Sequence, residues 1–343
     1  MAMPRLTKET LQRAAEALQA AVDAGYYLLG QPSAYEAAAK ALNLDQATFR
    51  HRAYRAFEEG YKVVEPVQEP EAPIIEKIEK PRIRIRAHSG SDAPVYRVLG
   101  IGDAHDHPGL PDKSRFKWMA RHAAAMKPDY VVQIGDFASM DCLSRHDAPG
   151  SMGQKNRPSY ANDLESLEEA LSAFYKDADG LDLHVTIGNH EKRIYRWEQS
   201  VAELEGTLWQ PLLDLFARYG WRTHDEGQFF FVGGVGFVHA PRTLMGREYG
   251  GKTLNAIAND SIFSIVFGHA HRGQILHAPK IGPLSSVTIC NLGTCLPTGY
   301  VAEYAKVATT GWTYGVWELT IQGGRIIGHN FISMNELEDR YGD

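Results

Sequence analysis

The sequence predicts an α/β protein preceded by a small helical unit, and three observations support this. Residues 1–62 are rich in alanine and carry apolar residues at helical spacing. Residues 63–95 contain five prolines, which remove backbone donors and fix φ, so this stretch predicts an extended linker. In residues 96–343, short apolar segments alternate with helical ones and then give way mainly to strands. That order is typical of a layered α/β domain.

Three helices are expected in the N-terminal unit. The first contains the apolar positions from Leu11 to Val22, and Gly30 offers a C-terminal stop. The second is expected over Ser33–Leu42. Asp45 is a candidate N-cap for the third helix, Gln46–Glu58, because its side chain can accept from the first free backbone N–H groups.

The expected elements of the C-terminal domain come from apolar runs and helical periodicity. The expected strands are Tyr96–Ile101, Tyr130–Ile134, Leu183–Ile187, Phe229–Val232, Val235–His239, Ile262–Phe267, Val287–Cys290, Gly315–Leu319 and Arg325–Asn330. The expected helices are Lys113–Met126, Asn162–Lys176, Glu203–Arg218 and Gly251–Asn259. A short strand at Ile83–Arg86, inside the linker, is a further possibility.

Composition and charge exclude several classes of protein. The chain has 343 residues with 36 basic and 42 acidic groups, a net charge of −6, which is ordinary for a globular protein. It shows no signal-peptide start and no apolar run near the ~20 residues of a membrane span. Three cysteines without a C-x-x-C pair argue against a disulfide scaffold or a cysteine zinc site and favour the cytoplasm. Twelve of the 14 histidines follow residue 95, so the chemistry is expected there.

Polar side chains follow five of the expected strands. They form the blocks Gly102-Asp103-Ala104-His105, Gly135-Asp136-Phe137, Gly188-Asn189-His190-Glu191, His239 and Gly268-His269-Ala270-His271. Open α/β sheets bind ligands beyond the carboxyl ends of their strands, and imidazole, carboxylate and amide groups bind transition metals. One such block alone is usually a turn or a core histidine. Their joint occurrence predicts a metal site.

These blocks, in this order, resemble the calcineurin-like metallophosphoesterase superfamily, whose pattern is D-x-H, G-D, G-N-H-E/D, H and G-H-x-H. The resemblance implies a four-layer sandwich, with two β-sheets flanked by helices, and a dinuclear metal site at one sheet edge. It implies a hydrolase that cleaves phosphoester bonds with metal-activated hydroxide. The mixed nitrogen and oxygen ligands favour Mn²⁺, with Fe, Zn²⁺, Co²⁺ or Ni²⁺ as alternatives, whereas so many imidazoles disfavour Mg²⁺.

The resemblance also assigns a role to each donor in the blocks. One metal is implied to bind Asp103, His105 and His271, and the other Asn189, His239 and His269. Asp136 would bridge the two metals. His190 would face the substrate, either as a stabiliser of the phosphate or as the general acid to the leaving group.

Three further side chains are candidates for substrate binding. Arg145 and His146 belong to the polar loop 141–156, which follows the second block, and such loops often bind substrates. Arg193 follows the third block and could reach a phosphate. A plain surface position is the alternative for each of them.

Residues 37–50 resemble a helix-turn-helix of the repressor and transposase type. Its second helix could enter a DNA major groove. The side chains that would line it are Gln46, Thr48, Arg50, Arg52 and Arg55. The near-neutral charge of this unit weakens the DNA interpretation, and the alternative is a three-helix bundle used for docking or oligomerisation. The combination of this unit with a phosphoesterase also resembles proteins carried by phages and prophages.

The leading hypothesis is therefore a phosphodiesterase or nuclease brought to DNA by the N-terminal unit. One alternative is a phosphomonoesterase or small-nucleotide hydrolase that uses this unit for assembly. Another is a non-catalytic DNA-binding or scaffold protein that retains the fold. The intact set of donors favours an enzyme. The sequence leaves open the natural substrate, the metal and the oligomeric state.

Overall fold

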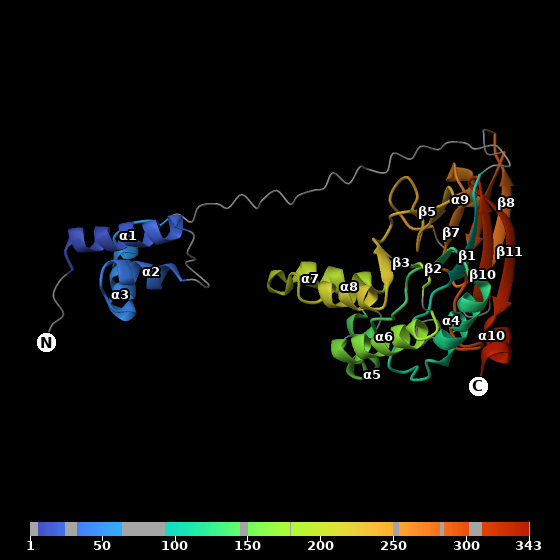
Figure 1. Cartoon of the computed structure of the whole chain (residues 1–343), viewed down its shortest axis with the longest axis horizontal. Coiled ribbons are helices and arrows are strands. Elements are labelled where there is room, and N and C mark those ends of the chain that lie inside the picture. Colours follow the sequence, from blue (N-terminus) through green and yellow to red (C-terminus); the bar gives the residue numbers. More distant parts are fainter. Residues whose placement is uncertain are drawn as a thin grey trace. The chain divides into compact units, whose positions relative to one another are not determined.

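The protein divides into two compact units, Met1–Arg84 and Ile85–Asp343. The computed structural model describes residues 6–24, 33–63, 93–144, 150–178, 180–249, 254–281, 285–301 and 311–342 (Figure 1). Most of the expected linker, including the possible strand Ile83–Arg86, lies outside these residues. None of the helices described is long and apolar enough to cross a membrane.

The N-terminal unit contains three helices. They are α1 (Lys8–Asp23), α2 (Ala34–Ala41) and α3 (Gln46–Glu58). The expected cap of α3 is confirmed, because the Asp45 carboxylate accepts from the Thr48 backbone N–H at 2.9 Å. Phe49 on α3 is fully buried against Leu18 and the small alanines of α1 and α2. The expected stop at Gly30 lies outside the described residues, and α1 ends at Asp23.

A six-stranded sheet forms one half of the larger unit. Its strands are β1 (Val95–Ile101), β2 (Tyr130–Gln133), β3 (Leu183–Thr186), β4 (Trp221–His224), β10 (Gly315–Gln322) and β11 (Arg325–Ser333). Their order is β11-β10-β1-β2-β3-β4. Strands β1 to β4 run parallel, so their carboxyl ends share one edge, while β10 is antiparallel to both of its neighbours.

A five-stranded sheet packs against the first. Its strands are β5 (Phe230–Val232), β6 (Val235–Phe237), β7 (Ile265–Phe267), β8 (Gln274–Pro279) and β9 (Ser286–Asn291), in the order β5-β6-β7-β9-β8. Strands β6, β7 and β9 run parallel. Val98 of β1 and Val266 of β7 share the core between the sheets. Because side chains alternate along a strand, Leu99 instead enters the core beneath the helices of the first sheet.

Helices cover the outer faces of both sheets. They are α4 (Ser114–Met126), α6 (Tyr160–Tyr175), α8 (Trp209–Arg218) and α10 (Met334–Tyr341) beside the first sheet, and α9 (Leu254–Asp260) beside the second. The remaining helical segments are α5 (Met152–Lys155), α7 (Lys192–Ser200) and two 3₁₀ turns, Asp141–Leu143 and Ala202–Leu204. The expected four-layer α/β sandwich is thereby confirmed (Figure 1).

Some expected elements differ in the structure. The single helix expected over Glu203–Arg218 is wrong: Gly206 has φ +76°, and α8 begins only at Trp209. The Glu198 carboxylate caps the N-terminus of α8 by accepting from the Leu208 backbone N–H at 2.9 Å. Strands β4 and β8 and helices α7 and α10 were not expected. All four elements are short, with four to nine residues, and β8 is also an edge strand with much of its surface exposed, so each offers little length in which a periodic pattern can be recognised.

Candidate metal centre

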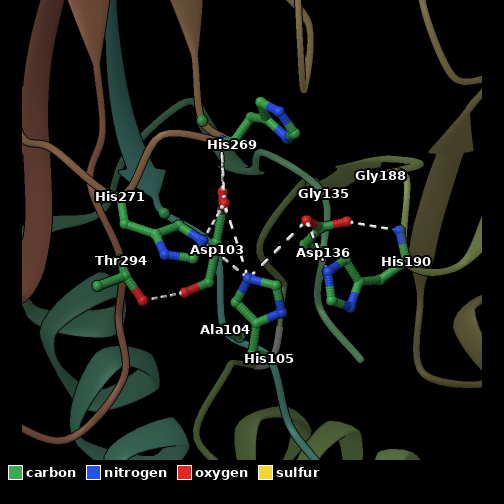
Figure 2. Close-up of polar contacts among 12 residues, drawn as sticks. Asp103, Ala104, His105, Gly135, Asp136, Gly188, His190, His269, His271 and Thr294 are labelled. Carbon is green, nitrogen blue, oxygen red and sulfur yellow. Dashed lines mark hydrogen bonds and ion pairs between the residues drawn. The ribbon is translucent and has the colours of Figure 1, made fainter. Parts of the chain in front are cut away.

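The predicted donors meet where the carboxyl ends of strands from both sheets converge. In the first sheet, the donors follow β1, β2 and β3; in the second, they follow β6 and β7. Figure 2 shows the side chains of Asp103, His105, Asp136, His190 and His271 gathered around one point. The sandwich therefore brings together five segments that are far apart in the sequence.

One group of donors consists of Asp103, His105 and His271. The His271 Nε2 atom lies 3.0 Å from Asp103 Oδ2 and 2.9 Å from His105 Nε2. His105 Nε2 lies 3.8 Å from Asp136 Oδ2. All four side chains are buried. Two imidazole nitrogens and a carboxylate oxygen thus face one small buried space.

A second group lies on the other side of Asp136. The His239 Nε2 atom is 3.2 Å from Asp136 Oδ2 and 3.0 Å from Asn189 Oδ1. His269 Nδ1 is 2.9 Å from the same Asn189 oxygen. Asp136 is the carboxylate common to the two groups, and its Oδ2 atom faces both His105 and His239.

Glycines at the strand ends allow the close approach of these donors. A Cβ atom on Gly268 would lie 2.2 Å from Asp103 Oδ1, and one on Gly188 would lie 2.1 Å from Asp136 Oδ1. Any side chain at either position would collide with a donor. The glycine that precedes each of these blocks is thus required by the packing of the site.

Four of the donors adopt a left-handed backbone conformation. His105, Asp136, His269 and His271 have φ values of +43°, +50°, +66° and +54°. Non-glycine residues rarely adopt such angles, and they gather at functional sites where the surroundings impose them. The backbone is held in this form so that the side chains point inward.

The comparison with protein families matches this part of the chain. Residues 96–273 fit the model of the calcineurin-like phosphoesterases. The chain belongs to the calcineurin-like phosphoesterase family. As a member of this family it is a phosphoesterase, and its buried histidine and aspartate clusters are consistent with a dinuclear metal centre.

Two solved structures are also similar to this phosphoesterase. One is Yfce, a phosphoesterase from E. coli, with 16% identity, a TM-score of 0.31, and coverage of 69% of this chain and 100% of that one. The other is TT1561 of Thermus thermophilus, with 9% identity, a TM-score of 0.27, and coverage of 70% and 100%. No curated protein matches the chain.

The electrostatics of the phosphoesterase centre favour a bound cation. Burial acts to lower the pKa of His239, but the carboxylates of Asp136 and Asp103 outweigh burial and raise this pKa to about 10. Burial would raise the pKa of Asp136, but His239 and His190 hold it well below its usual value. Burial, together with His190 and His271, lowers the pKa of His105 far below normal. The two buried carboxylates give the site a negative potential, and His105 is held neutral while His239 is held protonated. Such a site suits a metal ion, which would displace the proton from an imidazole that it binds.

The ion pairs and hydrogen bonds of the candidate donors also fit a bound metal ion. Among the described residues, the ion pairs of Asp103 and Asp136 are all made with histidines, and no lysine or arginine neutralises these buried carboxylates. The His239 Nδ1–H donates to the Ile134 carbonyl at 2.9 Å, which leaves Nε2 facing Asp136. Metal-ligating imidazoles commonly donate their second N–H in this way.

His190 lies beside Asp136 and is held there by hydrogen bonds. Its backbone N–H donates to Asp136 Oδ1 at 2.9 Å, and its Nδ1–H donates to the Ser139 carbonyl at 2.8 Å. The Arg193 guanidinium donates to His190 Nε2 at 3.2 Å and to the Ser139 carbonyl at 3.0 Å. Burial lowers the pKa of His190. Arg193 is therefore in direct contact with His190 rather than at a plain surface position.

Glu191 holds the backbone of the centre in place. Its carboxylate accepts from the backbone N–H groups of Asp136, Ala138 and Gly188 at 3.1, 2.8 and 3.0 Å. Burial, followed by the charge of Asp136, raises the pKa of Glu191 to about 7. Glu191 therefore joins the second and third blocks through their main chains.

Other supporting residues were missed from the sequence. Thr294 Oγ1 donates to the Asp103 carbonyl at 2.6 Å (Figure 2), and Asn291 Nδ2 donates to the Gly268 carbonyl at 3.1 Å. Asn291 is the last residue of β9 and Thr294 follows this strand, so the rule that polar residues collect at strand ends would have identified them. Glu248, 3.6 Å from His269 Nε2, lies in a loop that carries no such signal.

The other predicted residues fall in different places. Arg145 and His146 lie outside the described residues. His107, which follows the first block and is not one of the predicted donors, contacts the Tyr300 hydroxyl at 2.8 Å through Nε2 and is outside the donor groups. On α3, the helix proposed for DNA, Gln46, Arg50 and Arg55 are exposed, whereas Thr48 and Arg52 are partly buried.

Proposed function

We propose that the protein is a dinuclear metal-dependent phosphodiesterase that hydrolyses nucleic acid. The observation that carries the proposal is the convergence of three donor groups, namely Asp103–His105–His271, His105–Asp136–His190 and Asp136–His239–His269, within each of which the ligand atoms lie inside 4.8 Å of one another. Two adjacent metal positions that share a carboxylate are the arrangement found in many phosphoester hydrolases.

In this proposal one metal is held by Asp103, His105 and His271 and the other by Asn189, His239 and His269. Asp136 bridges them. Mn²⁺ is the proposed occupant, with Fe, Zn²⁺, Co²⁺ and Ni²⁺ as alternatives, because the donors are a mixture of imidazole nitrogen and oxygen. Two such ions supply a hydroxide at neutral pH and neutralise phosphoryl oxygens. The chain supplies their placement and a buried setting.

His190 is proposed to face the phosphate. The hydrogen bond from its Nδ1–H to the Ser139 carbonyl fixes the ring and directs Nε2 toward Asp136 Oδ2, 3.9 Å away. Arg193 lies next to Nε2 and adds positive charge there. A phosphoryl oxygen beside Nε2 could accept from His190 when this ring is protonated and from Arg193. His190 can then act as phosphate stabiliser or as proton donor to the leaving oxygen.

The surface beside His190 supports a nucleic-acid substrate. Helix α7 begins directly after Glu191 and carries Lys192, Arg193 and Arg196. The Arg196 side chain is 54% exposed, and Trp197 is 39% exposed on the same helix. Cationic side chains interleaved with aromatic ones are typical of surfaces that bind single strands, since they contact both phosphates and bases.

The N-terminal unit is proposed to bind DNA through α3. Gln46, Arg50 and Arg55 are exposed on this helix, as a recognition helix requires. The Thr48 hydroxyl donates to Asp45 Oδ2 at 2.5 Å, which commits it to the cap. We therefore centre the DNA-binding proposal on Gln46, Arg50 and Arg55.

The substrate class can be tested with a pair of model esters. With Mn²⁺ present, we expect kcat/KM for bis-p-nitrophenyl phosphate to exceed that for p-nitrophenyl phosphate by roughly tenfold or more, a difference of about 1.4 kcal/mol in transition-state binding. We also expect cleavage of single-stranded or duplex DNA. A preference for the monoester without DNA cleavage would instead indicate a phosphomonoesterase or small-nucleotide hydrolase.

The role of α3 is tested by reversing charge. We expect the double variant Arg50→Glu/Arg55→Glu to weaken DNA binding roughly tenfold or more at low salt, because two phosphate contacts become repulsive. Hydrolysis of model esters should be unchanged. The control Lys8→Glu/Arg13→Glu makes the same charge change on exposed positions of α1. Equal losses in both variants, measured by fluorescence anisotropy, would show that α3 has no special role.

A further inference from the structure

A small hairpin follows His239 and lies directly beside the metal centre. Arg242 and Glu248 pair as an antiparallel bridge. The Thr243 N–H donates to the Arg247 carbonyl at 2.8 Å, and the Gly246 N–H donates to the Thr243 carbonyl at 2.8 Å. Gly246 has φ +74°, which closes the turn. The segment therefore has a defined shape and does not depend on a ligand to form it.

Ion pairs hold the base of this hairpin against the centre. Glu248 Oε2 is 3.6 Å from His269 Nε2, and Glu248 Oε1 is 3.6 Å from the Arg242 guanidinium. Arg242 also donates to Glu226 Oε1 at 2.9 Å. The same Glu226 oxygen lies 3.6 Å from Arg196 of α7. The hairpin and the cationic helix α7 are thus joined through the Glu226 carboxylate.

The tip of the hairpin presents two apolar side chains to solvent. Leu244 is 99% exposed and Met245 is 86% exposed, so neither contributes to the core. Exposed Arg247 follows them. Met245 is three residues from Glu248, so at ~3.3 Å per residue it lies within about 10 Å of this residue, whose Oε2 atom is 3.6 Å from His269 Nε2. These two adjacent apolar side chains add no packing to the core, and their place on a fixed turn beside the donors leaves them available to a ligand.

We propose that this hairpin binds the nucleotide next to the scissile phosphate, with Leu244 and Met245 against its base and Arg247 near the following phosphate. Leucine and methionine side chains often contact or wedge between bases, and every base offers an apolar face. The hairpin would then act as a specificity element for nucleotide-containing diesters. This inference rests on the proposed phosphodiesterase function.

The test compares two diesters that share one leaving group, methyl p-nitrophenyl phosphate and thymidine 5′-(p-nitrophenyl phosphate). For the full-length, Mn²⁺-loaded double variant Leu244→Ser/Met245→Ser, we expect kcat/KM on the thymidine ester to fall about fivefold to tenfold. The loss should appear in KM, and the methyl ester should be hydrolysed as by the wild type. The matched control is Ile262→Ser/Ile281→Ser, which changes two exposed aliphatic residues at the opposite end of the second sheet; it should alter neither ester.

The outcomes separate the hairpin from the proposed function. A wild-type protein that cleaves neither diester would contradict the phosphodiesterase function itself. Cleavage of both esters, with an unchanged preference in the tip variant, would overturn the hairpin proposal alone. An equal loss on both esters would also overturn it, because that loss would show that the tip supports the metal centre rather than the nucleotide.

Discussion

Replacing Asp136 by Asn is expected to lower kcat on bis-p-nitrophenyl phosphate by about 1000-fold or more, because the proposed bridge between the metals would lose its charge. Asparagine has the same shape and can still accept the His190 backbone N–H, which reaches Asp136 Oδ1 at 2.9 Å. It lacks the charge that faces both His105 and His239 from Oδ2. A neutral amide is a poor bridge between two cations, so the metals should be held more weakly and placed less well.

The measurement is kcat with Mn²⁺, together with metal content by elemental analysis. We expect two ions per wild-type chain and fewer in Asp136→Asn, with an unchanged far-ultraviolet circular dichroism spectrum. Asp214→Asn, an exposed carboxylate on α8, is the matched control and should keep both ions and full activity. Near-normal turnover with two ions in Asp136→Asn would contradict the bridging assignment.

Replacing His190 by Ala is expected to lower kcat by about 100-fold to 10,000-fold, the usual range for loss of a proton donor or phosphate contact. In contrast to Asp136→Asn, this variant should retain both metal ions, because the proposal places His190 against substrate. The bonds of Glu191 to three backbone N–H groups remain and should preserve the fold. Added imidazole should restore part of the activity by occupying the space left by the ring.

Substrates with different leaving groups distinguish the two proposed roles of His190, general acid and phosphate stabiliser. A general acid predicts a larger loss with a phenyl leaving group than with p-nitrophenyl, because the poorer leaving group needs the proton more. A phosphate stabiliser predicts equal losses. His277→Ala, which removes an imidazole on β8 that contacts Thr288, is the control. Loss of one metal ion from His190→Ala would instead identify His190 as a ligand, as its closeness to Asp136 and His105 also allows.

The fold class was predictable because its signals are local. Apolar runs predicted β1 and β2 to within one or two residues, and Asp45 marked the start of α3. The signals failed where stability comes from neighbours. Gly206 interrupts an otherwise helical sequence, and β4 forms because β3 offers a free parallel edge to a short polar segment. The periodicity of one strand does not show which other strand it will pair with.

The sequence by itself predicted which residues could form a metal centre, since each donor block follows an apolar strand and carries metal-binding side chains. Only the tertiary structure decided how they meet. His105 and His271 are 166 positions apart, yet their Nε2 atoms lie 2.9 Å from each other. Likewise, only the fold joins Glu248 to His269 and the hairpin to α7. Such contacts depend on the packing of two separate sheets, whose approach is set by the shared core between them rather than by any local pattern of residues.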